Sequence, residues 1–429
     1  MADKKKRPDP EPKETPGTRP ERSISIKPHL LSWAVFIPTV AIVFISLIAV
    51  VFPALISRTT SLFQAAVFAP NVINPFQPGV LAVPLIIINI VILGIGIAYY
   101  KRSKCEAYFK KIASFEISKK QALIGVVIIL AIFAAITVGT LAKEETWVDY
   151  ADVKIRVQNW SLAEVVLSEP FVRYILLSAS LHIFGNIRII PMIASASLLL
   201  LTYFFTKNIT GKRFAGIVSM VLLLQSDIFV SYSTTASYDN FWIIFYLFSL
   251  YLILKFWPPS PVSYLVSIFS KPLTMAFLPM TLYFIARSSL SKKSKIYSLA
   301  SYGIITIATV AAISRLGLIG DTTSFDVSQF WQGFSAMAMQ LRFDYVVVLF
   351  LLPLTVMLFF ASRKGILHAD SILIFILVIL LTSPFLVGFT HQTNQPYRFV
   401  SLSVFFAIGV GVLLSSKSRK QQSELSSST

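Results

Sequence analysis

The sequence has one cysteine, four histidines and few charged residues, and each scarcity excludes a class of protein. A single cysteine, Cys105, cannot form an internal disulfide or a cysteine-based zinc site. His29, His182, His368 and His391 lie too far apart in the sequence for metal-ligand spacing. Charged residues make up only 14% of the 429 residues and hydrophobic residues 55%, with a mean hydropathy of +0.73. A water-soluble fold could not bury this much apolar surface, so we predict that lipid surrounds most of the chain.

Acidic residues are also scarce. There are 20 of them against 38 lysines and arginines, which gives a formal net charge of +18. In a soluble protein this excess would suggest nucleic acid as the partner. Here the basic residues lie in the connections between apolar runs, so we expect membrane lipids as partners and no nucleic acid.

Eleven apolar runs are long enough to cross a membrane. They lie at 33–57, 79–100, 121–142, 187–206, 214–232, 239–257, 272–287, 296–317, 344–361, 369–388 and 398–414. A further apolar segment at 261–271 would rise about 16 Å as a helix, roughly half of a ~30 Å hydrocarbon core. We count it as a short twelfth crossing.

The distribution of basic residues supports this count. If the N-terminus lies inside, alternate crossings place 28 of the 38 lysines and arginines in cytoplasmic segments, as the positive-inside rule requires. Omitting the half-length segment at 261–271 would place every later loop on the opposite side of the membrane. The sequence therefore predicts an all-α polytopic protein of the plasma membrane with about 12 transmembrane segments and both termini in the cytoplasm.

One outer connection, 143–186, carries six of the 14 acids that lie outside the terminal tails. Its acidic residues are Glu144, Glu145, Asp149, Asp152, Glu164 and Glu169. An amphipathic stretch at 150–167 and an apolar stretch at 171–184 are too mixed or too short to span, so we expect helices that lie in the membrane interface. A later outer segment, 326–342, is interpreted as a connector rather than as another interfacial helix.

Several short motifs follow one another in a characteristic order. They are Glu144-Glu145-Thr146 to Asp149, Glu169-Pro170 followed by Tyr174, Phe184-Gly185, Ser237-Tyr238-Asp239-Asn240-Phe241, Phe269-Ser270-Lys271-Pro272 with Pro279, and Gln395-Pro396-Tyr397-Arg398-Phe399. Their order and side resemble the GT-C glycosyltransferases, above all the protein mannosyltransferases and the lipid A aminoarabinose transferases. The resemblance covers roughly 60% of the chain, and its specificity lies in the order of the motifs, since each one alone is weak.

The resemblance implies an enzyme that moves a sugar from a polyprenyl-phosphate carrier to a lipid, glycan or protein acceptor on the outer face. Displacement of the phosphate in one step would invert the anomeric configuration. An acceptor hydroxyl needs a carboxylate base, and cations would stabilise the charge that develops on the leaving phosphate. The phosphate-binding role falls to Lys271, Arg398 and Arg173.

The base is sought among Asp149, Asp152, Glu145 and Asp239. The acidic pair of the family matches either Glu144-Glu145 or, with a shift of several residues, Asp149, and we prefer Asp149. Simpler roles compete with these assignments: Asp239 could be a helix N-cap, Lys271 could extend to the membrane surface and Arg398 could be an interfacial anchor. Some relatives need a divalent cation, which makes one a candidate cofactor, but the sequence predicts no metal-binding cluster.

The resemblance divides the chain into four regions. Residues 1–30 are a disordered basic cytoplasmic tail, 31–120 hold two extra transmembrane helices with a basic cytoplasmic loop, 121–414 form the GT-C-like core with its outer catalytic loop at 143–186, and 415–429 are a cytoplasmic tail. Two other functions are open: a secondary transporter or lipid flippase, and a non-catalytic membrane subunit of the same fold. A carrier would place its ionisable residues near mid-membrane, whereas the acids here gather in one outer loop.

Overall fold

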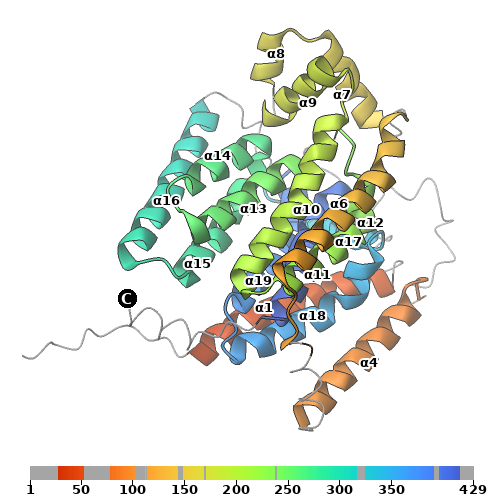
Figure 1. Cartoon of the computed structure of the whole chain (residues 1–429), viewed down its shortest axis with the longest axis vertical. Coiled ribbons are helices and arrows are strands. Elements are labelled where there is room, and N and C mark those ends of the chain that lie inside the picture. Colours follow the sequence, from red (N-terminus) through yellow and green to blue (C-terminus); the bar gives the residue numbers. More distant parts are fainter. Residues whose placement is uncertain are drawn as a thin grey trace, which may run out of the picture.

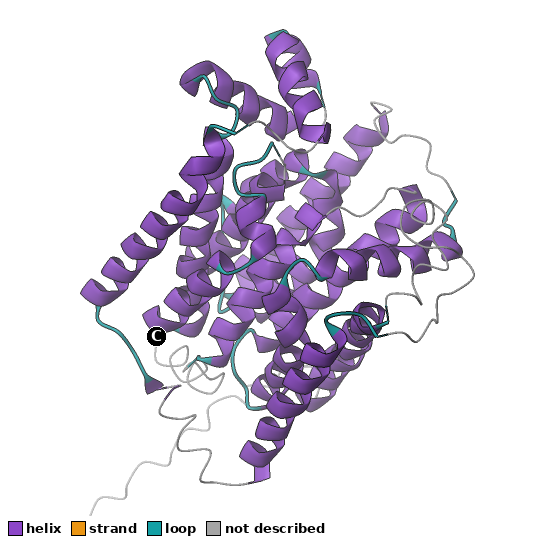
Figure 2. Ribbon diagram, turned by 90° about the vertical axis from the view of Figure 1, so that its right-hand side faces the viewer, coloured by secondary structure: helices purple, strands orange, loops and turns teal. Residues whose placement is uncertain are grey.

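The structure is a computed structural model that describes residues 28–52, 78–101, 112, 114–143, 148–168, 171–236, 239–315, 324–390 and 396–415. Throughout these ranges the regular elements are helices, and no β-strand occurs (Figure 2). The predicted all-α class is therefore confirmed. Glu145 and the Ser237-Tyr238 part of the Asp239 motif lie outside the described residues.

The helices form one bundle, with three shorter helices projecting from one end (Figure 1). They are α1 (Pro28–Val51), α4 (Ala82–Lys101), α6 (Lys119–Leu141), α7 (Val148–Asn159), α8 (Leu162–Leu167), α9 (Phe171–Phe184), α10 (Ile189–Thr210), α11 (Arg213–Leu224), α12 (Asp227–Ser231), α13 (Asp239–Lys255), α14 (Ser260–Ser270), η1 (Pro272–Phe277), α15 (Leu278–Arg287), α16 (Lys292–Arg315), α17 (Val327–Leu341), α18 (Tyr345–Arg363), α19 (Ala369–Thr390), η2 (Pro396–Phe399) and α20 (Val400–Leu413).

Six of these helices, within the described ranges, are long and apolar enough to cross a membrane: α1, α6, α10, α16, α18 and α19. Shorter apolar helices include α4, α11, α13, α14 and the run from η2 into α20. Long, outward-facing aliphatic side chains on α4 and α6, such as Ile90 and Leu123, are exposed, as expected of helices that face hydrocarbon. The protein is an all-α membrane protein, and the total of twelve crossings stays a prediction.

The half-length segment before Pro272 is a separate helix, α14, which ends at Ser270. Lys271 then has an extended backbone, with φ −157° and ψ 106°, before a 3₁₀ turn leads into α15. Proline explains the break, because its ring disfavours the helical conformation for the residue before it and it has no N–H to donate. The predicted crossing at 272–287 consequently begins as η1, and only its second part, α15, is α-helical.

Two other expectations need correction. The predicted crossing at 214–232 is divided into α11 and α12, because the Ser226 hydroxyl accepts a hydrogen bond from the Phe229 N–H (3.2 Å) and so starts a new helix. The interpretation of 326–342 as a connector is wrong, since most of it is helix α17, which packs against α19 and α1. Gly333 permits close contact there, because a Cβ would lie 2.6 Å from the Pro384 Cα.

The first helix of the chain is part of the bundle rather than an appendage. Helix α1 packs against α17, α18 and α19, and the Phe36 ring stacks on Phe359 with ring centres 4.1 Å apart. The hydroxyls of Ser32 and Ser362 are hydrogen-bonded at 2.9 Å. Helix α4, in contrast, packs mainly on α18. The two N-terminal helices that the family resemblance left unexplained therefore differ in how deeply they are integrated.

Contacts between residues that are distant in the sequence define two ends of the bundle. At one, which we call the loop end, α6 finishes beside α10 and the segment after α12: Arg188 donates to the Lys143 carbonyl (2.8 Å), and the hydroxyls of Thr140 and Thr234 lie 2.9 Å apart. Helices α7 to α9 project from this end (Figure 1).

At the other end, which we call the basic end, α15 finishes beside the start of α19, α20 finishes beside the end of α10, and α11 starts beside the segment before α6. Its basic residues are Lys119, Lys120, Lys207, Lys212, Arg213, Arg287, Lys292, Lys293, Lys295, Arg363 and Lys364. The positive-inside rule predicts that this end faces the cytoplasm.

Candidate functional site

A small cavity of about 30 Å³ lies between four segments of the chain towards the loop end. We call it the Lys271–Arg398 pocket. Its lining residues are Trp242 from α13; Lys271, Leu273, Thr274 and Phe277 from the α14–η1 junction; Ile379, Thr382, Ser383 and Leu386 from α19; and Arg398, Phe399 and Ser401 from η2 and α20. Six of these twelve side chains are polar or charged and six are apolar, so the lining combines two cations and four hydroxyl groups with an apolar wall.

Lys271 enters the pocket because the helix breaks at this residue. Its backbone N–H still donates to the Ser267 carbonyl (3.0 Å), and its side chain is only 6% exposed. The ammonium nitrogen lies 5.3 Å from the centre of the Trp242 ring, within the range of a cation–π interaction. A lysine that extended to the membrane surface would be more exposed, so the snorkelling alternative is not favoured.

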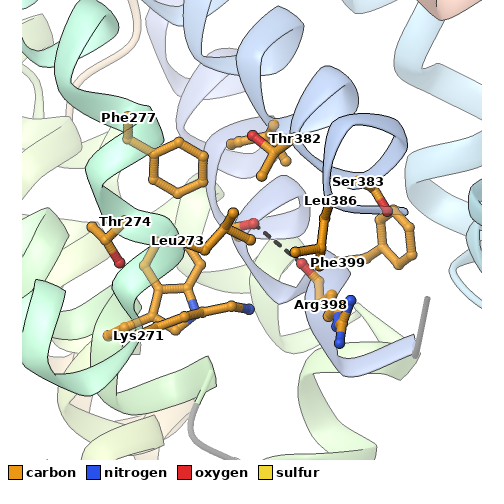
Figure 3. A pocket seen from close by; sticks show the side chains of 12 residues that line it. Lys271, Leu273, Thr274, Phe277, Thr382, Ser383, Leu386, Arg398 and Phe399 are labelled. Atoms are coloured by element: carbon orange, nitrogen blue, oxygen red, sulfur yellow. Dashed lines mark hydrogen bonds between the residues drawn. The ribbon is translucent and has the colours of Figure 1, made fainter. Parts of the chain in front are cut away.

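Arg398 reaches the pocket from the opposite wall (Figure 3). It lies in η2, the 3₁₀ turn that Pro396 begins and that leads directly into α20. The Ser401 hydroxyl donates to the Arg398 carbonyl (3.4 Å) and continues this turn into the helix. The structure thus brings together two of the three cations that the sequence assigned to phosphate binding, although they come from distant parts of the chain.

Helix α7 of the acidic loop contacts the segment that carries Arg398. The rings of Tyr150 and Tyr397 have centres 6.0 Å apart, and Tyr232, just after α12, lies 5.7 Å from Tyr397 on a second side. Tyr150, Val153 and Val157 recur at helical spacing and form the buried face of α7. The loop that holds most of the predicted acids therefore packs beside η2.

Arg173 has a different environment from the other two predicted cations. It is buried on α9, its Nε donates to the Ala236 carbonyl (2.8 Å), and its guanidinium carbon lies 6.0 Å and 5.4 Å from the ring centres of Tyr150 and Tyr174. It does not line the Lys271–Arg398 pocket. Its contacts join α7 and α9 to the segment after α12, and a role in phosphate binding stays a prediction.

The structure describes the predicted acids less completely than it describes the predicted cations. Asp149 is in the first turn of α7, directly before the buried Tyr150, and Asp239 is the first residue of α13, three positions before Trp242. The side chains of both acids lie outside the described part of the structure. Asp152 is on the exposed face of α7. Next to Asp239, the Asn240 amide donates to the Ser195 hydroxyl (2.7 Å) and the Tyr232 carbonyl (3.0 Å), which fixes the start of α13.

Glu164, in contrast, has a local structural role. Its carboxylate accepts hydrogen bonds from the hydroxyl and the backbone N–H of Ser161, both at 2.7 Å, in the capping box that begins α8. These two bonds lower the pKa of Glu164 below its ordinary value.

The described side chains include no group of three or more histidine, cysteine, aspartate or glutamate residues able to hold a metal ion. A divalent cation as cofactor stays a prediction from the family resemblance. A second cavity, about 230 Å³, lies between α6 and α10 and is lined by Leu130, Phe133, Ala134, Met192, Ile193, Ala196, Ser197 and Leu200. Its lining suits hydrocarbon and offers no group for chemistry.

Asp344 is a buried acid that the sequence reasoning missed. It is 1% exposed and caps the start of α18, where its carboxylate accepts from the Val347 N–H (3.1 Å). The same carboxylate accepts from the hydroxyls of Ser226 and Ser403, the latter at 2.8 Å. An aspartate directly before an apolar run is a recognisable N-cap signal, but its two serine partners are 118 and 59 positions away.

No protein-family model matches the sequence, and no curated protein is significantly similar to it.

Proposed function

We propose that this protein transfers a sugar from a polyprenyl-phosphate carrier to an acceptor hydroxyl at the loop end of the bundle. The observation that carries the proposal is the Lys271–Arg398 pocket, in which two cations from distant segments line one half-apolar cavity. A lipid phosphate has the matching chemistry, an anion joined to hydrocarbon. The order of motifs that resembles the GT-C glycosyltransferases supports a sugar as the transferred group.

In the proposed reaction an oxygen of the acceptor hydroxyl attacks the anomeric carbon, and the bond from that carbon to the phosphate oxygen breaks. The hydroxyl proton passes to a carboxylate, for which we propose Asp149. Polyprenyl phosphate leaves with one more negative charge, and Lys271 and Arg398 stabilise that charge as it develops. Attack and departure on opposite sides of the carbon invert its configuration.

We also propose that the protein lies in the plasma membrane with its basic end towards the cytoplasm. The basic residues gathered at that end support this orientation. Both termini would then be cytoplasmic and the Lys271–Arg398 pocket would open towards the outer face. A cysteine placed at Asp152, after Cys105 is changed to serine, should react with a membrane-impermeant maleimide in intact cells, and one placed at Lys293 should not.

The test of the function uses the full chain reconstituted in liposomes with labelled polyprenyl-phosphate hexoses and a mixture of lipid and glycan acceptors. We expect release of free polyprenyl phosphate together with a labelled product. Lys271→Met and Arg398→Met should each lower the rate about 10²-fold to 10³-fold. Arg342→Met is the matched control, because Arg342 is exposed at the same end and does not line the pocket. Undiminished transfer in both pocket variants would contradict the proposal.

A membrane carrier is the second candidate, favoured by the broken helix at Lys271, since discontinuous helices form the substrate sites of many transporters. The same liposomes distinguish the two. A carrier would move the intact lipid-linked sugar between leaflets without releasing phosphate. If neither release nor movement occurred, the remaining interpretation would be a non-catalytic membrane subunit.

A further inference from the structure

We propose that Asp344 is a positioning residue that holds the start of α20 so that Arg398 faces the lipid phosphate. This inference rests on the proposed function. Asp344 itself does not line the Lys271–Arg398 pocket and would touch neither donor nor acceptor. It acts through the two helices that its carboxylate joins.

Three separate elements meet at the Asp344 carboxylate. It accepts from the Val347 N–H at the start of α18, from the hydroxyl of Ser403 in α20, and from the hydroxyl of Ser226, which caps α12. Ser226 and Ser403 are 2% exposed, so all three polar groups are removed from water. A buried carboxylate is stable only with such partners, and each partner is in turn fixed by it.

Both helices held by Asp344 lead to η2. In α20, Ser403 bonds Asp344 while Ser401, two positions earlier, lines the pocket and bonds the Arg398 carbonyl. In the other direction, α12 ends beside Tyr232, whose ring contacts Tyr397, the neighbour of Arg398. The Asp344 carboxylate therefore fixes η2 from two sides.

This arrangement predicts a specific defect when the contacts of Asp344 are lost. A shift of η2 would move the Arg398 guanidinium away from the anion, whereas the apolar wall contributed by α13, η1 and α19 would remain in place. The affinity for a prenyl phosphate should fall, and the affinity for the uncharged prenol should not. A general loss of stability would lower both together.

The test measures equilibrium binding of labelled farnesyl phosphate and of farnesol to the full chain in lipid nanodiscs. In Asp344→Ser the new hydroxyl can still cap α18 but is too short to reach both serines. We expect about tenfold weaker binding of farnesyl phosphate for Asp344→Ser, about threefold for Ser403→Ala, and less than twofold change for farnesol in either variant. Ser403→Ala removes a single hydrogen bond and keeps the measurement available if Asp344→Ser folds poorly.

Asp326→Ser is the matched control. Asp326 also caps a helix at the loop end, since its carboxylate accepts from the Ser328 N–H (2.7 Å), and the structure gives its carboxylate no bond to α12 or α20. Its substitution should leave both affinities unchanged.

A double-mutant cycle completes the test. Once Arg398→Met has removed the guanidinium, adding Ser403→Ala should weaken farnesyl phosphate binding no further, whereas it should add fully to Lys271→Met. Two results would overturn the positioning role alone. One is that the effects of Ser403→Ala and Arg398→Met on farnesyl phosphate binding add fully. The other is that Asp344→Ser and Ser403→Ala both keep the preference for farnesyl phosphate over farnesol unchanged. If the unaltered protein did not prefer farnesyl phosphate to farnesol, the proposed function would fail, and this inference with it.

Discussion

The two ends of the bundle use their cations in different ways. At the basic end, Arg287 donates to the Asp370 carboxylate at 2.6 Å, and the Tyr283 hydroxyl donates to the same oxygen at 2.8 Å. Neither of the cavities described above is lined by these residues. At the loop end, Lys271 and Arg398 line a small cavity between four segments of the chain. The contrast separates a cation whose work is to hold helices together from cations placed to meet a ligand.

The comparison predicts that changes at the two ends affect different properties. A change at the loop end should alter transfer and leave the folded bundle intact. A change at the basic end should alter stability and leave transfer intact wherever the protein is folded.

The largest effect is expected at the loop end. Asp149→Asn should lower transfer from a polyprenyl-phosphate sugar by about 10²-fold to 10⁴-fold, because the amide cannot take the proton of the acceptor hydroxyl. Thermal unfolding in detergent should not change. Glu164→Gln is the control on the same loop and should retain activity, since Glu164 serves the capping box. Full activity of Asp149→Asn would remove the proposed base and reopen the choice among Asp152, Glu145 and Asp239.

At the basic end, Arg287→Met should lower the free energy of unfolding by about 3 kcal/mol, because it leaves the buried Asp370 carboxylate without its cation. The rate per folded molecule should stay the same. Lys293→Met is the control, because Lys293 is an exposed lysine near the start of α16 at the same end. Thermal unfolding followed by circular dichroism checks both. A variant that is stable but inactive would contradict the division between the two ends.

A smaller effect tests packing at the basic end. Gly216→Ala should cost about 1–3 kcal/mol of stability, because the added Cβ would lie 2.6 Å from a ring carbon of Tyr203 and 2.8 Å from its carbonyl oxygen. Helices α10 and α11 would have to separate. Gly303→Ala on α16 is the control, since a Cβ there meets nothing within 4 Å. If both variants melted at the same temperature as the parent, the close contact between α10 and α11 would be wrong.

The smallest effect concerns the acidic loop. Because the pKa of Glu164 is lowered in the folded protein, its contribution to stability is present above the ordinary value of 4.5 and is lost as the pH falls through the folded value. Amide exchange of Glu164 and Val165 should quicken over that acidic interval, once corrected for intrinsic rates. Transfer should be unaffected by Glu164→Gln. If the corrected exchange rates of these two amides did not change over the acidic interval in which the Glu164 carboxyl takes up its proton, the cap would not be formed in solution.

Much of the fold was predictable because the hydropathy and the local chemistry of each segment follow directly from the order of its residues. Long apolar runs predicted α1, α6, α10, α16, α18 and α19, and the separation of 261–271 from 272–287 predicted the break that isolates α14. The outer stretches at 150–167 and 171–184 do form the helices α7, α8 and α9. Residues 326–342 were misread because the amphipathic face of α17 becomes meaningful only when α19 and α1 are present to cover it.

The candidate site was predictable only in part. Alternate crossing of the membrane predicted that Lys271 and Arg398 share one side, and the structure adds that they share one pocket. The division of 214–232 was not foreseen. A single serine within an apolar run, such as Ser226, is only a weak signal for the start of a new helix. Arg173 was assigned to phosphate, yet its Nε is engaged by the Ala236 carbonyl, a backbone atom that no side-chain pattern reveals.

The sequence by itself determined that this is a helical membrane protein, which stretches form its long apolar helices, and where proline interrupts them, because these depend on transfer to lipid and on local backbone sterics. Only the tertiary structure decided which polar groups meet: Lys271 with Arg398 around a cavity, and Ser226 with Ser403 at Asp344. Such contacts depend on how the helices pack side by side. Because all the helices present similar apolar surfaces to lipid, the hydropathy pattern along the sequence says little about which helices become neighbours.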